Sequence, residues 1–366
     1  MHVRYSYLPQ QFGQIDDLLE EIRRFVATGD FTLGAPLTTF ETRFADLIGT
    51  RHAIGVGSGT DAIKLSLKAL GVGHGDEVIT TANTFIATVG AIAELGARPV
   101  FVDCDDTYCM DVSQVEAKIT ERTRAIVPVH FTGYMVEMAP LMEIAARHKL
   151  PVVEDACQAI LADIDGKRAG TFGITGAFSL HPLKNLNVWG DGGVITTNDD
   201  AMAQRLRLIR NHGLRNRDEI EILGCNSRLD TLQAVVGNWL IGTTQDITAR
   251  RIANAARYDA GLAKISQIRL PPRPATRKRV YHLYTVFAED RDGLYAALQE
   301  AGVECKIHYP IPVYLQQGLK AFGYQKGDFP VADRHATEII SFPCDQHLSN
   351  DEIDYVLDCV RRYYAG

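Results

Sequence analysis

Short apolar runs alternate with amphipathic helical segments through the first two thirds of the chain. The runs have the length of buried strands and lie at 52–57, 77–81, 99–103, 125–129, 151–155, 177–180 and 194–198. Between them, apolar residues recur at helical spacing, as at Ile63, Leu67 and Leu70. Strands that alternate with helices predict a sheet covered on both faces. We therefore expect an α/β domain with a mainly parallel seven-stranded sheet, in which ligands bind at the carboxyl ends of the strands.

The pattern changes towards the C-terminus. Helical spacing predicts one helix at 14–27 and a long helical stretch at about 229–264. From Tyr281 we expect a strand at 282–287, a helix at 292–301, a strand that carries Lys306, His308 and Tyr309, and a closing helix from Asn350. This order predicts a smaller α+β domain. We place the large domain at 1–245 and the small C-terminal domain at 246–366.

The composition is that of a soluble globular protein, with 46% hydrophobic residues, 23% charged residues and a formal net charge of −7 over 366 residues. A mildly acidic chain is a poor partner for nucleic acid or for an anionic membrane surface. No apolar run approaches the ~18 residues that span a bilayer, and the start lacks a signal-peptide layout. The seven cysteines are scattered without paired CxxC spacing. We expect reduced thiols, no metal site and a cytoplasmic protein.

A glycine-rich turn follows the first expected strand. Gly55-Val-Gly-Ser-Gly-Thr60 leads into a helix near Asp61, where backbone N–H groups and the helix dipole favour a phosphate. An ordinary tight turn and a dinucleotide-binding turn are the alternatives. The glycine spacing misses GxGxxG, and the chain has no Gly-Lys-Ser/Thr, which excludes a P-loop.

Later strand ends carry further candidate side chains. Phe85 follows the second strand, where the alternative is a core phenylalanine. Glu154 and Asp155 close the fifth strand, and a buried carboxylate needs a partner. That partner is either the cationic ring nitrogen of a cofactor or an arginine or helix cap. Lys184 stands between two apolar strands, where burial favours the neutral amine that a Schiff base requires; the alternative is a solvated charge.

The order of these motifs resembles the DegT/DnrJ/EryC1/StrS family of sugar aminotransferases, which have the pyridoxal phosphate fold type I. The resemblance covers nearly the whole chain, and it rests on the order and spacing of many short motifs. The matching segments are Gly34 with Phe40-Glu41, Ser58-Gly-Thr60, Gly75-Asp-Glu-Val78, Glu154-Asp-Ala156, Phe178-Ser-Leu-His-Pro-Leu-Lys-Asn185, Gly190-Asp-Gly-Gly193, His212-Gly-Leu214, Asn226-Ser-Arg228, His308-Tyr-Pro310 and Asp328-Phe-Pro330.

This resemblance implies roles for individual residues. Lys184 would form the Schiff base with pyridoxal phosphate, and Asp155 would pair with its pyridinium nitrogen. The other implied cofactor contacts are Phe85 on the ring face, Gly59, Thr60 and Ser179 on the phosphate, Gln158 beside the ring hydroxyl, and Asn226 in the partner subunit's site. The candidate substrate contacts are Thr32, Leu33, Gly34, His181, Lys306, His308 and Tyr309. Gly133-Tyr134 departs from the more frequent Gly-Gln of the family, so the contact near the substrate at this position stays open.

The implied activity is transfer of an amino group from an amino acid, usually L-glutamate in the family, to a keto or aldehyde sugar. Pyridoxal phosphate would alternate with pyridoxamine phosphate in a unit that is at least a homodimer. The acceptor would be a nucleotide-linked keto-deoxyhexose or an oxidised octulosonic acid, for cell-envelope polysaccharide such as lipopolysaccharide or for related amino sugars. Lys306 and His308, as actual or potential cations, would suit an anionic acceptor. The alternatives are a pyridoxamine phosphate-dependent sugar dehydratase, whose members replace the lysine by histidine, and a non-catalytic regulatory protein on this scaffold.

Overall fold

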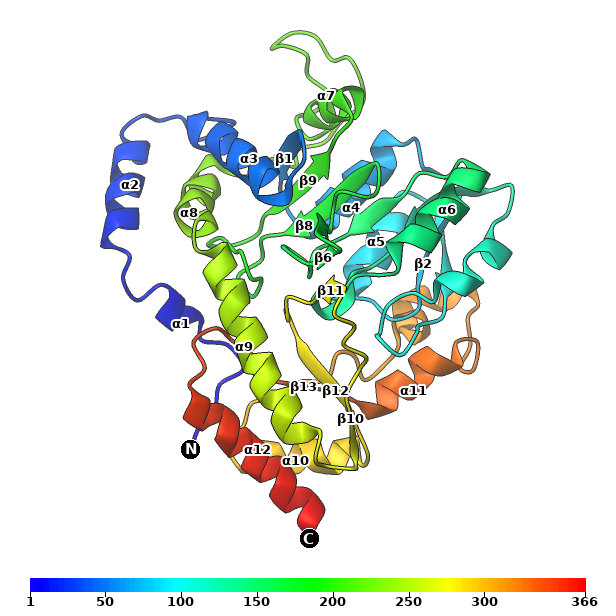
Figure 1. Ribbon diagram of the computed structural model, residues 1–366. Helices are drawn as coiled ribbons and strands as arrows, with labels where there is room; N and C mark the ends of the chain where they lie inside the picture. The colour runs from blue at the N-terminus through cyan, green and yellow to red at the C-terminus, as the bar shows by residue number, and fades with distance from the viewer.

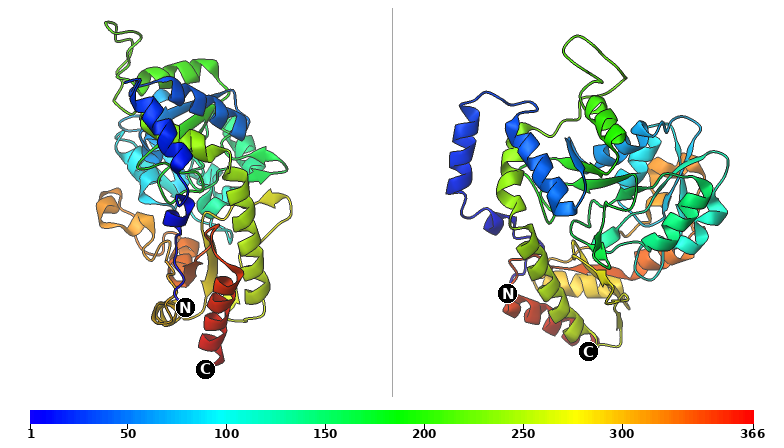
Figure 2. Two further views of the ribbon diagram at one scale, coloured as in Figure 1. Left: turned by 90° about the vertical axis from the view of Figure 1, so that its left-hand side faces the viewer. Right: turned by 45° about the horizontal axis from the view of Figure 1, so that its top comes forward.

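The computed structural model describes residues 1–366. Figure 1 shows a large α/β body and a smaller body beneath it, with helix α9 (Thr244–Leu262) running from one to the other. The N-terminal segment starts beside the smaller body and reaches the larger one through α1 (Leu8–Gln11) and α2 (Asp16–Val26). Both chain ends therefore lie at the smaller body, as the two views of Figure 2 also show.

The larger body is built on two hydrogen-bonded sheets with strand orders β1-β9-β8-β5 and β3-β2-β4. Isolated parallel bridges join β4 to β5, at Ile126 with Val152 and at Val129 with Asp155. Only β9 runs antiparallel to its neighbours, so the arrangement is mainly parallel. The strands are β1 (His52–Val56), β2 (Glu77–Thr81), β3 (Arg98–Val102), β4 (Thr123–Val127), β5 (Val153–Asp155), β8 (Thr175–Ser179) and β9 (Gly193–Thr197).

Helices cover both faces of these strands. One face is packed by α2, α3 (Ala35–Ile48), α6 (Met138–His148) and α8 (Thr231–Ile241). The other face is packed by α4 (Gly59–Ala69), α5 (Ile86–Ala93) and α7 (Asp200–Ile209). No helix combines the length and the apolar character that crossing a membrane requires.

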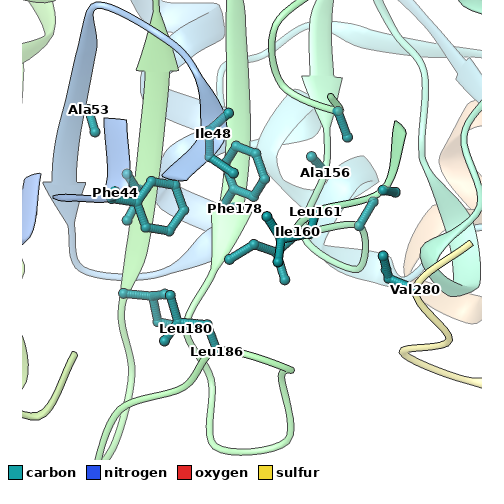
Figure 3. Close-up of a cluster of buried hydrophobic side chains, with 14 of the residues drawn as sticks. Phe44, Ile48, Ala53, Ala156, Ile160, Leu161, Phe178, Leu180, Leu186 and Val280 are labelled. Atoms are coloured by element: carbon teal, nitrogen blue, oxygen red, sulfur yellow. The ribbon is translucent and has the colours of Figure 1, made fainter. Parts of the chain in front are cut away.

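Alternate residues of each strand pack on opposite faces of the sheet, because successive side chains of a strand point to opposite sides. Phe178 and Val194 pack in the cluster with α3 and α8, whereas their neighbours Ala177 and Ile195 pack in the cluster with α4 and α7. In Figure 3 the rings of Phe44 and Phe178 meet in the first cluster, with centroids 5.2 Å apart. Burial on both faces explains why the strands read as continuous apolar runs.

The smaller body joins an antiparallel sheet of order β10-β12-β13 to helices near the chain end. Its buried cluster includes Val3 and Tyr7, so the first residues of the chain pack with the last hundred. We still propose two domains, and the division near residue 245 stays a prediction. The elements are β10 (Ile268–Arg269), β12 (Tyr284–Ala288), α10 (Arg291–Glu300), α11 (Pro330–Glu338), β13 (Ile339–Phe342) and α12 (Asn350–Ala365).

The remaining elements are short. A small sheet of order β11-β6-β7 links the two bodies, from β6 (Asp163–Ile164), β7 (Lys167–Arg168) and β11 (Arg277–Lys278). Five 3-10 turns lie at η1 (Val112–Gln114), η2 (Glu116–Lys118), η3 (Phe131–Gly133), η4 (Val313–Leu315) and η5 (Gln317–Phe322).

Two secondary-structure predictions were wrong. The helical stretch at 229–264 is broken between α8 and α9, where Gly242 caps α8 and the Thr243 hydroxyl donates to the Leu240 carbonyl. The strand expected at 306–309 is reduced to a single bridge between Lys306 and Ser341. The prolines that follow at 310 and 312 have no N–H to donate to a sheet, so the pairing cannot extend.

A buried carboxylate clamps the end of β5. Glu154 and His130 are both fully buried, and the His130 Nε2–H donates to Glu154 Oε2 at 2.9 Å. Backbone N–H groups of the 170–173 turn also donate to Glu154, at 2.7 to 2.8 Å. His130 Nδ1 accepts from the Val136 N–H, which leaves the ring proton on Nε2. Glu154 thereby ties the strand that ends in Asp155 to its surroundings.

We predict that Glu154→Gln destabilises the protein by about 3 kcal/mol, because the amide turns an N–H group towards donors that then lack an acceptor. Urea unfolding followed by circular dichroism measures the change. Glu116→Gln is the control, since Glu116 pairs with Arg147 and His148 at the surface and its replacement should leave the midpoint unchanged. Equal midpoints for Glu154→Gln and wild type would contradict the clamp.

Candidate active site

A cavity of about 290 Å³ opens at the carboxyl ends of β1, β5 and β8. Ten of the site residues predicted from the sequence line this cavity, and they come from both bodies of the molecule. They are Gly59, Thr60, Phe85, Asp155, Gln158, Ser179, His181, Lys184, His308 and Tyr309. Residues far apart in the chain therefore meet at the carboxyl ends of the strands, where ligand binding was expected.

One end of the cavity presents neutral hydrogen-bond donors. Ser58 caps α4 by accepting from the Asp61 N–H at 3.0 Å, while the N–H groups of Gly59 and Thr60 donate to no protein acceptor. A Cβ on Gly59 would lie 2.7 Å from the Ser179 Cβ, so this close approach requires glycine. Ser179 accepts from the His181 N–H, which leaves its own proton free. Free N–H groups at a helix start and a hydroxyl fit a phosphate.

Asp155 supplies the buried negative charge of the site. The carboxylate is 5% exposed, and its Oδ2 accepts from the Thr88 hydroxyl at 2.7 Å. Its Oδ1 accepts from the Cys157 N–H at 3.1 Å. No arginine or lysine is paired with it, so neither of these contacts neutralises the charge. A buried anion held in this way suits a cationic group in the cavity.

Lys184 lies in the turn that follows β8. Its backbone N–H donates to the His181 carbonyl at 2.8 Å, and its own carbonyl accepts from the Asn187 amide at 2.9 Å. The ammonium group has no hydrogen-bond partner in the chain. Burial lowers the pKa of Lys184, and the nearby negative charge of Asp155 opposes this only in part. A lysine of lowered pKa beside a free carboxylate is suited to nucleophilic and acid–base work.

The smaller body contributes a wall of neutral rings. Burial lowers the pKa of His308 to about 4, and its Nδ1 lies 2.9 Å from the Ser341 hydroxyl. Burial also holds the pKa of His282 well below its usual range. Tyr309 faces Phe85 across the cavity, with ring centroids 6.0 Å apart. Near pH 7, His308 therefore supplies hydrogen-bonding capacity and not the positive charge considered from the sequence.

Gln158 is oriented by the backbone. Its side-chain oxygen accepts from the Thr132 N–H at 2.7 Å, which turns the amide NH₂ towards the cavity. Tyr134, the departure noted in the sequence, does not line the cavity. Its buried ring lies under Arg277 and Arg279, 5.6 and 5.9 Å from their guanidinium carbons. Tyr134 therefore contributes to packing between the two bodies.

Several predicted site residues lie outside this cavity. Asn226 is exposed on the loop after α7 and pairs with Asn211. Leu33 packs partly buried against the core, and the Gly34 N–H donates to the Thr231 hydroxyl at 3.2 Å. Thr32 and Lys306 are exposed and also absent from the lining. Any contact of these residues with the cofactor or the substrate stays a prediction.

Sequence reasoning missed other lining residues, among them Thr84, Thr88, Cys157, Asp191 and His282. Thr88 follows Thr84 by one helical turn, so hydroxyls at i and i+4 around Phe85 were an available signal. His282 offered none, because it reaches the cavity only through the packing of the smaller body.

Comparison with known proteins identifies a family. The DegT/DnrJ/EryC1/StrS aminotransferase family matches residues 14–361. A dTDP-3-amino-3,4,6-trideoxy-alpha-D-glucose transaminase of Streptomyces venezuelae is 41% identical over 343 residues, covering 93% of this chain and 90% of its own. A pleiotropic regulatory protein of Geobacillus stearothermophilus is 40% identical over 368 residues, covering 100% and 99%.

Solved structures agree. DesV of S. venezuelae, in complex with a ketimine intermediate, superposes with a TM-score of 0.96 at 39% identity, covering 99% of this chain and 98% of that one. NtdA of Bacillus subtilis, with bound pyridoxamine phosphate, gives 0.93 at 29% identity, covering 100% and 86%. The expected α/β aminotransferase fold is confirmed, whereas the strands pair in sheets of four and three and not in one sheet of seven. The pyridoxamine phosphate in NtdA is one of the two expected forms of the cofactor. The chain belongs to the DegT/DnrJ/EryC1/StrS aminotransferase family.

Proposed function

We propose that the protein is a pyridoxal phosphate-dependent sugar aminotransferase. The observation that carries the proposal is one cavity that holds an amine, a carboxylate and a cluster of free donors. Lys184 has a lowered pKa, Asp155 has no basic partner, and the start of α4 presents unpaired N–H groups. These are the three chemical contacts that the cofactor requires.

The cofactor fits the residues that are present. Gly59, Thr60 and Ser179 would hold the phosphate without a basic side chain, because the nearby Lys64 is paired with Asp61 and Glu94, both at 3.0 Å. Asp155 would accept from the ring nitrogen. The exposed ring of Phe85 would cover one face of the cofactor, and the Gln158 amide would donate to its ring oxygen.

When bound, pyridoxal phosphate supplies the carbonyl that takes up the amino group and a ring that stabilises negative charge at the donor α-carbon. The protein supplies proton transfer and orientation. Lys184 Nζ would take the proton from the donor α-carbon and deliver it to the C4′ carbon of the cofactor. Asp155 would pair with the protonated ring nitrogen. We retain L-glutamate as the expected donor.

For the acceptor we propose a nucleotide-linked hexose with a keto group at carbon 3. Relatives between 38 and 41% identical are named for 3-amino or 3-oxo sugars linked to dTDP or UDP. The neutral wall of His282, His308 and Tyr309 supports this, because sugar hydroxyls need donors and acceptors and not charge. The product would enter polysaccharide or related amino-sugar biosynthesis.

We further propose a homodimer that shares its active sites. Large apolar side chains are exposed around the Asn226 loop and on α8, including Ile220 at 66%, Leu223 at 85% and Leu232 at 39%. Figure 1 shows the loop after α7 standing clear of the body. A second copy would cover these side chains and bring Asn226 towards a cofactor phosphate.

Two alternatives come from the same scaffold. A sugar dehydratase would replace the catalytic lysine by histidine, whereas this chain has Lys184. A regulatory protein is the name given to one relative at 40% identity. Such a protein need not retain Lys184, Asp155 and the free donors in one cavity, and all three are present.

The activity is tested by the visible absorption band of the bound cofactor. We expect L-glutamate to discharge the band and a nucleotide-linked 3-keto sugar to restore it, while Lys184→Ala shows neither change. Lys264→Ala, at an exposed position, is the control and should behave as wild type. A band that no amino acid discharges would favour the regulatory alternative.

The capture of pyridoxal phosphate by the cofactor-free protein should depend on pH. Its rate should rise with pH, because the neutral amine of Lys184 is the reactive form. The midpoint should lie below the ordinary lysine value of about 10.4, since burial lowers the pKa. Asp155→Asn removes a charge that raises the Lys184 pKa and should move the midpoint lower still. Stopped-flow absorbance measures the midpoint, and a value at or above 10.4 would contradict the burial argument.

If each active site is shared by two subunits, mixed dimers of two defective variants should recover tight cofactor binding. Asn226→Ala should weaken cofactor binding about tenfold by removing one hydrogen bond to a charged group. After exchange with excess Lys184→Ala subunits, each intact Lys184 faces an intact Asn226, so tight binding should return. Equilibrium titration of the absorption band measures both. Mixed dimers that form without recovery would place Asn226 outside the site.

A further inference from the structure

Two threonines lie in a row behind Asp155. The hydroxyl oxygens of Thr84 and Thr88 are 2.7 Å apart, and the Thr88 hydroxyl is 2.7 Å from Asp155 Oδ2. The side chains are all buried, with exposures of 2%, 1% and 5% in chain order. Both threonines line the cavity.

The direction of these hydrogen bonds follows from the carboxylate. An ionised carboxylate only accepts, and a hydroxyl has one proton to donate. The Thr88 proton is therefore directed to Asp155, so the Thr88 oxygen accepts the proton of Thr84. Both protons point the same way, towards the acid.

This arrangement fixes the rotation of the Asp155 carboxylate. Oδ2 is held by Thr88 and Oδ1 by the Cys157 N–H, so turning the group would break both hydrogen bonds. Threonine is stiff at its first side-chain torsion, which makes it a good anchor. Each carboxylate oxygen keeps a lone pair that is available to the cavity.

The segment from Thr84 to Thr88 also carries an aromatic ring that faces the cavity. Phe85 lies between the two threonines at the start of α5 and is 51% exposed. The segment from Thr84 to Thr88 therefore connects the aromatic platform to the acid. Packing alone does not require hydroxyls here, because valine has nearly the same shape and a buried hydroxyl is costly unless bonded.

We propose that Thr84 and Thr88 are positioning residues that set the orientation of Asp155 towards the ring nitrogen of the cofactor and couple it to the Phe85 ring. The proposal rests on the function proposed above. Thr88 acts directly on the carboxylate, and Thr84 acts through Thr88.

Thr88→Val tests the proposal by removing the hydroxyl while keeping the shape. We expect its dissociation constant for pyridoxal phosphate to rise about tenfold, and the rate of band discharge by glutamate to fall about tenfold, the usual effect of losing one hydrogen bond to a charged group. Thr88→Ser should stay within about twofold of wild type, because the hydroxyl is restored. Thr84→Val should show a smaller loss than Thr88→Val. Thr248→Val is the control, since Thr248 is a buried helical threonine of α9 that donates to the Thr244 carbonyl.

A cofactor analogue with C–H in place of the ring nitrogen separates positioning from general damage. Wild type and Thr88→Val should bind this analogue equally, since it offers Asp155 no N–H. Both should also bind inorganic phosphate equally, and both should remain folded at the assay temperature without cofactor. If Thr88→Val binds pyridoxal phosphate as wild type does, or loses the analogue as well, the proposal is overturned. If wild type itself binds no pyridoxal phosphate, the proposed function fails instead.

Discussion

The site depends on how β5 ends between β4 and β8. Parallel pairing sets Asp155 opposite Ala177, two residues before β8 ends and the turn with Lys184 begins. Strand alternation then sends Glu154 and Asp155 in opposite directions. Glu154 enters the protein and takes four hydrogen bonds, whereas Asp155 faces the cavity with two. Two adjacent acids are thus given a structural and a chemical role by the geometry of one strand.

Charge is distributed sparingly around the cavity. The phosphate end offers N–H groups and a hydroxyl, and the histidines of the smaller body are held neutral by burial. The buried uncompensated charges are those of Asp155 and, when protonated, Lys184, whereas the Asp191 carboxylate at the lining is exposed to solvent. Because few other charges lie nearby, Asp155 and Lys184 interact strongly with a charged ligand that binds between them. This is the physical reason that a cofactor with a phosphate, a ring nitrogen and a reactive carbonyl is a good match.

Much of the site could be predicted from the sequence because its residues follow strands. Gly59, Thr60, Asp155 and Lys184 stand just after apolar runs, and the strand ends of a mainly parallel sheet meet at one edge. The charge of His308 could not be predicted, since its pKa depends on burial by distant segments. His282 belongs to the same class, because it reaches the cavity only through packing of the smaller body. Thr88 had a signal in its spacing from Thr84, but its hydrogen bond to Asp155 depends on packing.

Errors in the secondary structure also have local causes. The strand expected at 306–309 forms one bridge and is followed by prolines at 310 and 312, which have no N–H to donate to a sheet. The break between α8 and α9 lies at Gly242, which the helical pattern had spanned. Tyr134 shows the limit of motif comparison. Its departure from the family pattern was noted as a substrate question, and the structure places the ring beneath two arginines.

The central claim is that Lys184 is the residue that bonds to the cofactor. The most direct measurement is borohydride reduction of the protein with bound pyridoxal phosphate, followed by proteolysis and mass spectrometry of the peptides. The account predicts one modified peptide, which contains Lys184. A modification on another lysine, or none at all with the cofactor in excess, would contradict it.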